Sequence, residues 1–91
     1  MSADGVIHDG VAETIRRFLV EWFVHDERRE NLPDDLDLIR SGILDSLAII
    51  RTATFLEELS GTEIGVHDLT PKNIGSIAAM AGFVRRLRAQ P

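Results

Sequence analysis

The sequence predicts an all-α domain: a small bundle of three main helices plus one short helix, with a long loop after the first helix. Apolar residues recur at spacings of three and four in three separate segments, which is the period of an amphipathic helix. No segment shows the alternating pattern of a strand, and no internal repeat or low-complexity segment is present. A chain of 91 residues is long enough for one hydrophobic core and too short for two.

The first helix carries the clearest amphipathic pattern. Asp9 is a candidate cap, since a carboxylate accepts hydrogen bonds from the free amides of a first turn. The apolar stripe spans four turns and contains the single Trp and two of the four Phe residues. Its members are Val11, Ile15, Phe18, Leu19, Trp22 and Phe23. We expect this helix to supply much of the core, and a loss of about 3–5 kcal/mol if a core Phe18 or Trp22 is truncated to alanine.

The loop after this helix is long and has its own apolar anchors. A charged stretch at 25–30 is followed by Pro33, which argues against continued helix. Five later residues are expected to hold the loop on the core: Leu36, Leu38, Ile39, Ile43 and Leu44. A connection of this length with its own anchors is more often functional than accidental.

The second helix is expected to start at Asp45 or Ser46 and to end near Ser60 and Gly61, where the glycine suits a C-cap. One side holds Ile49, Ala53, Leu56 and Ser60, flanked by Ile50 and Leu59. Another side holds Leu47, Arg51, Thr54 and Glu58.

The remaining segment predicts a turn at 61–66 anchored by Ile64, a short helical turn at 66–71, and a last helix. Thr70 and Pro71 suit an N-cap and a first helical position. Gly75 or Ser76 caps the last helix, whose inward residues are Ile77, Met80, Ala81, Val84 and Leu87.

The composition excludes several kinds of site. Without cysteine the chain has no disulfide, thiolate nucleophile or cysteine-ligated metal, so any thiol chemistry needs a cofactor. The histidines His8, His25 and His67 are far apart and form no ligand spacing, so no metal is expected. No apolar run is long enough to span a bilayer, and the first residues do not resemble a secretory signal, so we expect a cytoplasmic protein.

Charge is distributed unevenly along the chain. Residues 1–68 carry a net charge of −9 and residues 69–91 carry +4. The acidic body repels nucleic acid and favours basic partner surfaces. The arginines Arg85, Arg86 and Arg88 lie near a helix C-terminus, where we expect them to interact with the helix dipole from a solvated face.

The stretch from Gly42 to Leu47 is the most informative part of the chain. It places Ser46 where a loop gives way to a helix, with Asp45 before it and Leu47 after it. A hydroxyl at this point stands clear of the core and at the positive end of a helix dipole, which suits a covalently attached phosphate.

Four segments together resemble the acyl and peptidyl carrier protein family, over about residues 10–88. These segments are Gly42–Leu47, Phe55–Glu58, Thr62–Ile64 and Leu69–Ile77. The resemblance implies that Ser46 bears 4'-phosphopantetheine from coenzyme A, that Asp45 contacts the transferase that attaches it, and that Leu47 is an exposed docking contact. Arg51, Thr54 and Glu58 would lie on the same partner-docking side. Residues 1–8 would then be a flexible arm, 9–88 the carrier domain and 89–91 a tail.

The implied function is that of a carrier, not an enzyme: an acyl or aminoacyl intermediate is held as a thioester and presented to other proteins. The implied partners are a phosphopantetheinyl transferase, a loading enzyme (an adenylating enzyme or an acyltransferase) and downstream synthase enzymes. No nucleic acid or membrane partner is expected, and a monomer is the simplest state.

Departures from the family pattern point to a subclass. Ala48 and Arg51 occupy positions that are often acidic in carriers of bacterial fatty acid synthesis, and Ser60 replaces a bulky apolar residue. The Leu69–Asn73 stretch is more similar to stand-alone carriers of specialised metabolism. The sequence therefore favours a free-standing carrier in a polyketide or nonribosomal peptide pathway.

Three alternatives stay open from the sequence. One is a carrier of fatty acid synthesis, and another is an unmodified interaction domain that binds through Leu47, Arg51 and Thr54. The third is a small enzyme with Ser46 as nucleophile, which is disfavoured because no histidine stands in a triad order and the adjacent Asp45 is poorly placed as a base.

Overall fold

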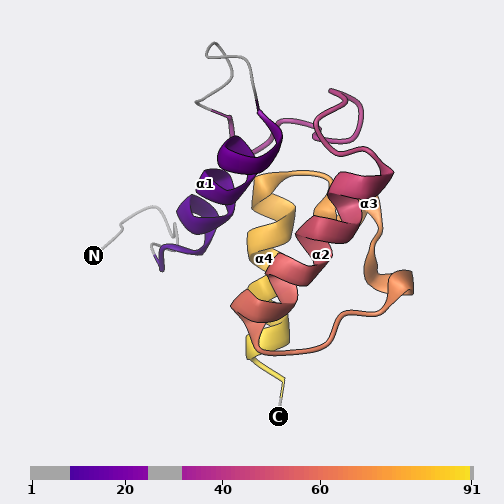
Figure 1. Ribbon diagram of the computed structural model, residues 1–91. Coiled ribbons are helices and arrows are strands. Elements are labelled where there is room, and N and C mark those ends of the chain that lie inside the picture. Colours follow the sequence, from indigo (N-terminus) through magenta and orange to yellow (C-terminus); the bar gives the residue numbers. More distant parts are fainter. Residues whose placement is uncertain (1–8, 25–31, 91) are drawn as a thin grey trace.

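The computed structural model describes residues 9–24 and 32–90 (Figure 1). The expected arm at 1–8, the charged stretch at 25–30 and Pro91 lie outside the described residues. The elements are α1 (Val11–Phe23), α2 (Ser46–Ser60), the 3-10 turn η2 (Val66–Asp68), the short α3 (Pro71–Ile74) and α4 (Ile77–Arg88). The all-α prediction is confirmed, since these described ranges contain helices and turns but no strand.

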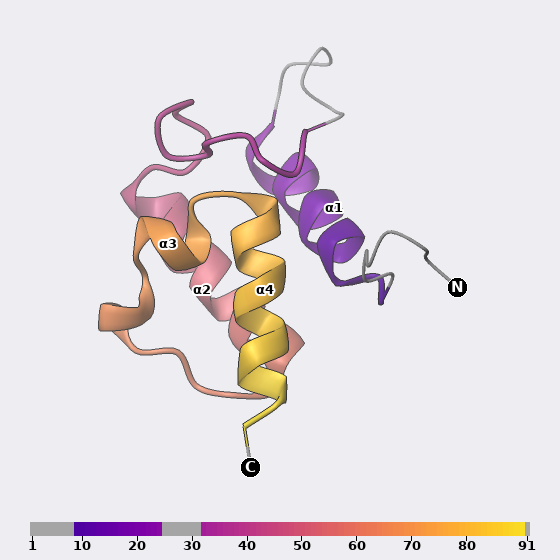
Figure 2. The ribbon, with the colours of Figure 1, turned by 180° about the vertical axis from the view of Figure 1, so that it is seen from behind.

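Helix α4 is the common packing partner of the other helices. It packs against α1, α2 and α3, and Figure 2 shows it running beside α2 with α1 at its flank. Its buried residues are Ile77, Met80, Ala81, Phe83, Val84 and Leu87, which confirms the predicted inward set and adds Phe83. Of the two candidate caps, Ser76 is the cap, because its Oγ accepts a hydrogen bond of 3.0 Å from the amide of Ala79. None of the described helices could span a membrane.

The core face of α1 is narrower than predicted. Val11, Ile15 and Leu19 are buried, while Phe18 and Phe23 are half-buried. The prediction that Trp22 is a core residue is wrong, because its exposed fraction is 51%. Periodicity gives the direction of a side chain around a helix, but not whether a neighbouring element extends to that level along the axis. The large stability loss that applies to a buried aromatic is therefore not expected at Trp22.

The buried face of α2 also differs in part from the prediction. Leu56 is buried as expected, but its companions are the small Ala48 and the polar Thr52. Ile50, expected at the flank of the inward side, is 61% exposed. Apolar periodicity missed this face because alanine and threonine contribute little to a hydrophobic pattern. The Oγ1 of Thr52 is buried without a hydrogen-bond partner among the described residues.

The long loop is anchored on the core as predicted. Leu38, Ile43 and Leu44 are buried and Leu36 and Ile39 are half-buried; Leu32 is a further buried anchor. The loop is also tied by its backbone to the junction of α3 and α4. The amide of Leu38 donates to the carbonyl of Gly75 (2.8 Å), and the amide of Ala78 donates to the carbonyl of Asp34 (2.9 Å). These bonds fix the path of the chain into α2.

The three arginines near the end of α4 do more than face solvent. The Arg85 guanidinium donates two hydrogen bonds of 2.8 and 2.9 Å to the Asp9 carboxylate at the start of α1. Arg86 donates to the side-chain oxygen of Asn73 (2.9 Å). Arg88 donates to the backbone oxygen of Leu59 (2.7 Å). The expectation of a merely solvated face is thus corrected, since each arginine links α4 to a different segment.

The expected role of Asp9 as the cap of α1 also needs correction. The N-cap position is Gly10, whose positive φ of 80° turns the chain into the helix. Asp9 stands one residue earlier, and its Oδ1 accepts a hydrogen bond of 3.1 Å from the amide of Val11. The carboxylate therefore still serves the first turn, while it also holds Arg85.

A first prediction concerns the packing of α1. Leu19 is fully buried and Leu47 is 64% exposed, so the two leucines form a matched pair. We expect Leu19→Ala to lower the free energy of unfolding by about 2–5 kcal/mol, and Leu47→Ala to change it by about 0.5 kcal/mol or less. Urea denaturation followed by circular dichroism measures both. Equal losses in the two variants would contradict the described core.

A second prediction follows from the ion pair between Asp9 and Arg85. The hydrogen bonds from Arg85, and then that from the Val11 amide, hold the pKa of the Asp9 carboxyl well below its usual range. As the pH falls, the Asp9 carboxyl is protonated in the unfolded chain before it is protonated in the folded chain, because its pKa is lower in the folded chain. The ion pair therefore stabilises the fold above about pH 4, and this stabilisation is lost as the pH falls further. We expect Asp9→Asn to be less stable than the wild type at pH 7, and the difference to shrink toward pH 3.

Urea denaturation across this pH range measures that difference in unfolding free energy. Asp35→Asn is the control, because it removes an exposed negative charge of the loop without touching the ion pair. A gap between Asp9→Asn and the wild type that stays constant with pH would show that the ion pair does not contribute.

Candidate functional site

Ser46 is the first residue of α2, and its position is set by Gly42 and Asp45, which shape the turn before the helix. Gly42 has a positive φ of 84°, which lets the loop reverse before the helix. Asp45 is the N-cap in extended conformation, and its Oδ1 accepts a hydrogen bond of 2.8 Å from the amide of Ala48. The helix therefore begins where the sequence predicted, with the serine on its first turn.

Buried anchors on both sides push the serine outward. Leu44 and Ala48 are 3% and 4% exposed, whereas the three residues between them, Asp45, Ser46 and Leu47, are all exposed. The amide of Leu44 also donates to the carbonyl of Leu38 (2.9 Å), which closes the loop behind the serine. The hydroxyl of Ser46 is thus held on a fixed backbone and remains open to a second protein.

The start of α2 offers backbone hydrogen-bond donors beside Ser46. The first amides of a helix have no intrahelical acceptor, and the helix dipole adds partial positive charge there. Asp45 takes the amide of Ala48, which leaves those of Ser46 and Leu47 for another acceptor. The first turn itself contains no acidic residue. A phosphate group on the serine fits this arrangement, because its negative charge meets the helix end.

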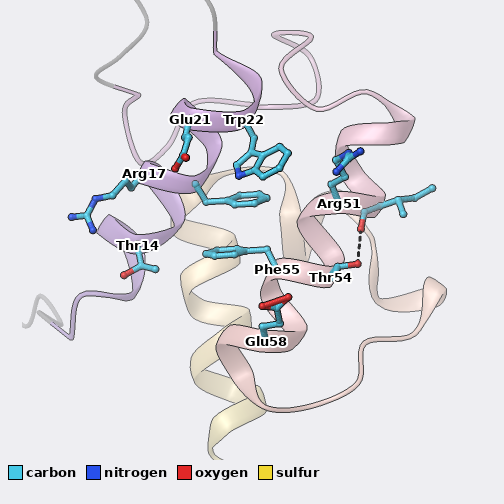
Figure 3. Close-up of a pocket in the computed structure, with 10 residues that line it drawn as sticks. Thr14, Arg17, Glu21, Trp22, Arg51, Thr54, Phe55 and Glu58 are labelled. Atoms are coloured by element: carbon cyan, nitrogen blue, oxygen red, sulfur yellow. Dashed lines mark hydrogen bonds between the residues drawn. The ribbon is translucent and has the colours of Figure 1, made fainter.

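The other predicted site residues share one side of α2 with the serine. Leu47 is exposed as the sequence analysis expected, and Arg51, Thr54 and Glu58 are exposed as well. The Oγ1 of Thr54 donates to the carbonyl of Ile50 (3.4 Å), as Figure 3 shows. The structure thus brings these residues to one continuous face.

The sequence did not predict that two further residues of this face would be exposed. Trp22 and Ile50 are large, apolar and more than half exposed. The guanidinium carbon of Arg51 lies 5.5 Å from the centre of the Trp22 ring, so α1 also contributes to the face. Ile50 could have been found from its spacing, because it lies three and four residues from Leu47 and Thr54. Trp22 carried no such signal, since its periodicity matched the core stripe.

The site does not contain the parts of a hydrolytic centre. His67, the one histidine in the described ranges, is exposed on η2, and its ring pairs with Asp68. Within those ranges, no three His, Cys, Asp or Glu side chains gather to hold a metal ion. His67 therefore lies on a different element from Ser46, which begins α2.

Comparison with known proteins decides the family. The chain is 32% identical over 66 residues to the probable acyl carrier protein PigG of Serratia sp. (strain ATCC 39006). The matched region covers 72% of this chain and 76% of that protein. This chain belongs to the acyl carrier protein family. No family model matches the sequence. Acyl carrier proteins are carriers and not enzymes, they generally bear 4'-phosphopantetheine, and they interact with phosphopantetheinyl transferases and synthase enzymes.

A prediction tests how the carrier fold positions the serine. Asp45→Ala removes the acceptor of the Ala48 amide, and we expect a loss of about 0.5–2 kcal/mol in unfolding free energy. Ser46→Ala is the control one residue on, because its exposed hydroxyl contributes no hydrogen bond among the described residues. Chemical denaturation of both variants measures the difference. A larger loss in Ser46→Ala than in Asp45→Ala would contradict the assigned cap.

Proposed function

We propose that this protein is a free-standing carrier in which Ser46 is the attachment site of 4'-phosphopantetheine. The carried acyl or aminoacyl intermediate serves a polyketide or nonribosomal peptide pathway. The observation that carries the proposal is the exposed serine on the first turn of α2, between the buried Leu44 and Ala48. The family membership supports the carrier role.

The residues around Ser46 have different proposed roles in its modification. The free first-turn amides favour the phosphate, while Asp45 keeps the helix start in place through its bond to Ala48. A carboxylate next to a phosphodiester is a like charge and does not help to hold it, so Asp45 is assigned to the basic surface of the transferase. When bound, phosphopantetheine supplies a terminal thiol on a flexible arm, on which acyl groups are carried as thioesters.

Partner enzymes are proposed to dock on the exposed side of α2. Leu47 provides an apolar contact beside the serine, and Arg51, Thr54 and Glu58 extend the surface along the helix. This surface is mixed in charge rather than strongly acidic. A strongly acidic helix attracts enzymes that have basic surfaces, and such surfaces would repel Arg51. This favours a role in specialised metabolism over one in fatty acid synthesis.

The decisive test is the intact mass of the protein before and after incubation with coenzyme A, magnesium and a broad-specificity phosphopantetheinyl transferase. We expect the wild type to gain one phosphopantetheine group and Ser46→Ala to gain none. Ser41→Ala is the matched control, because Ser41 lies in the loop that leads to Ser46 but donates its hydroxyl to the carbonyl of Leu38 (3.1 Å). It should be modified like the wild type. Absence of any gain on the folded wild type would favour an unmodified interaction domain.

The docking surface has a test of its own. We expect Leu47→Asp to lower the kcat/KM of the transferase roughly tenfold, the effect of losing about 1.4 kcal/mol of interface contact. Val66→Asp is the control, since Val66 is 87% exposed on η2 and belongs to no predicted contact. An unchanged kcat/KM in Leu47→Asp would remove Leu47 from the docking surface.

A further inference from the structure

A groove runs along the surface between α1 and α2 (Figure 3). Its floor is a pair of aromatic rings, Phe18 from α1 and Phe55 from α2. Their centres are 4.1 Å apart and their planes differ by 6°, so the rings lie flat on one another. The groove has a volume of about 610 Å³, which lies within the range of small-molecule sites.

The upper part of the groove exposes apolar surface that the fold leaves uncovered. Trp22 tilts against Phe18 with a centre-to-centre distance of 6.1 Å and remains 51% exposed. Ile50 is 61% exposed on the facing helix. The polar and charged residues that also line the groove are Thr14, Arg17, Glu21, Arg51, Thr54 and Glu58. The groove therefore combines apolar surface with polar groups of both charges.

This groove is continuous with the surroundings of the serine. A second hollow of about 450 Å³ is lined by Asp45 and Leu47, the two chain neighbours of Ser46, and it shares Trp22 and Arg51 with the groove. Ser46 itself lines neither hollow. The Arg51 guanidinium lies over the Trp22 ring at the junction of the two hollows. A molecule attached at Ser46 can thus follow the surface from the helix start into the groove.

The length of the proposed arm matches this path. At 1.5 Å per residue, Ile50 is about 6 Å and Phe55 about 14 Å along α2 from Ser46. Phosphopantetheine joins the serine oxygen to its sulfur by about fourteen bonds, which extend over roughly 17 Å at about 1.2 Å per bond of extended chain. Folded back along α2, the arm brings its thioester end over the floor of the groove.

We propose that the α1–α2 groove binds the acyl group carried by this protein, and that it selects a compact, planar apolar group such as an aromatic acyl unit. This inference rests on the proposed function of Ser46. An aromatic group gains contact with the part of Trp22 that remains exposed and with Ile50. A long alkyl chain gains less, because the stacked rings of Phe18 and Phe55 close the floor of the groove.

The test compares three cargoes on the same protein. A broad-specificity transferase attaches acetyl-, benzoyl- or octanoyl-phosphopantetheine from the matching coenzyme A thioester, and intact mass confirms each product. Amide resonances in ¹H–¹⁵N spectra and the emission of Trp22, the single tryptophan, then report where the cargo lies. We expect the benzoyl form to shift amides at 17–22 and 50–58 and to change the emission, with smaller effects from acetyl and octanoyl.

Two variants of exposed residues sharpen this test. Ile50→Asp places a charge in the groove and should lose most of the benzoyl-dependent shifts, while Val66→Asp, far along the chain on η2, should retain them. Shifts confined to residues 44–48, shifts centred on α3 and α4, or equal shifts with acetyl would overturn the groove assignment and leave the attachment at Ser46 standing. Failure to gain mass would overturn both proposals.

Discussion

The apolar face of α4 is covered by three other helices, and each of these is positioned mainly by its contacts with that one surface. Six residues of α4 are buried, and they share one hydrophobic core with Val11, Ile15 and Leu19 of α1 and with Ala48 and Leu56 of α2. The arginines at the end of the helix secure its other sides by bonds to Asp9, Asn73 and Leu59. The position of α2, and with it the serine on its first turn, depends on this shared core.

The exposure of Ser46 is a consequence of burial on either side of it. Leu44 and Ala48 cannot move outward without losing contact with the core, and Asp45 ends the extended chain by capping the helix. The three residues between the anchors must then face solvent. A carrier needs such a point, because an enzyme must reach the hydroxyl while the rest of the domain stays folded.

Most of the fold was predictable from local patterns in the sequence. The helix caps were predictable, because each cap depends on residues next to one another in the sequence. These caps are Asp45 and Gly61 at the two ends of α2 and Ser76 before α4. The loop anchors Leu38, Ile43 and Leu44 were also predictable, since apolar residues in a polar stretch have few other places to go. Helical spacing placed Leu47, Arg51, Thr54 and Glu58 on one side of α2, but it did not predict the exposure of Ile50.

Features that depend on distant segments were not predictable in this way. Trp22 matched the core stripe of α1 yet is 51% exposed, and it lies between Phe18 of its own helix and Arg51 of α2. The roles of Arg85, Arg86 and Arg88 require knowledge of which segment ends beside α4. The groove between α1 and α2 arises only when both helices are in place, so neither sequence segment indicates it.

The bond from Arg88 to the backbone of Leu59 has a practical consequence for work with this carrier. It places the end of α4 beside the end of α2, and Leu59 lies 13 residues after Ser46, which is about 20 Å along the helix. An affinity handle or a surface linkage joined after Gln90 would therefore leave Ser46 and the start of α2 accessible. Immobilised protein should remain open to partner proteins at that end of the helix.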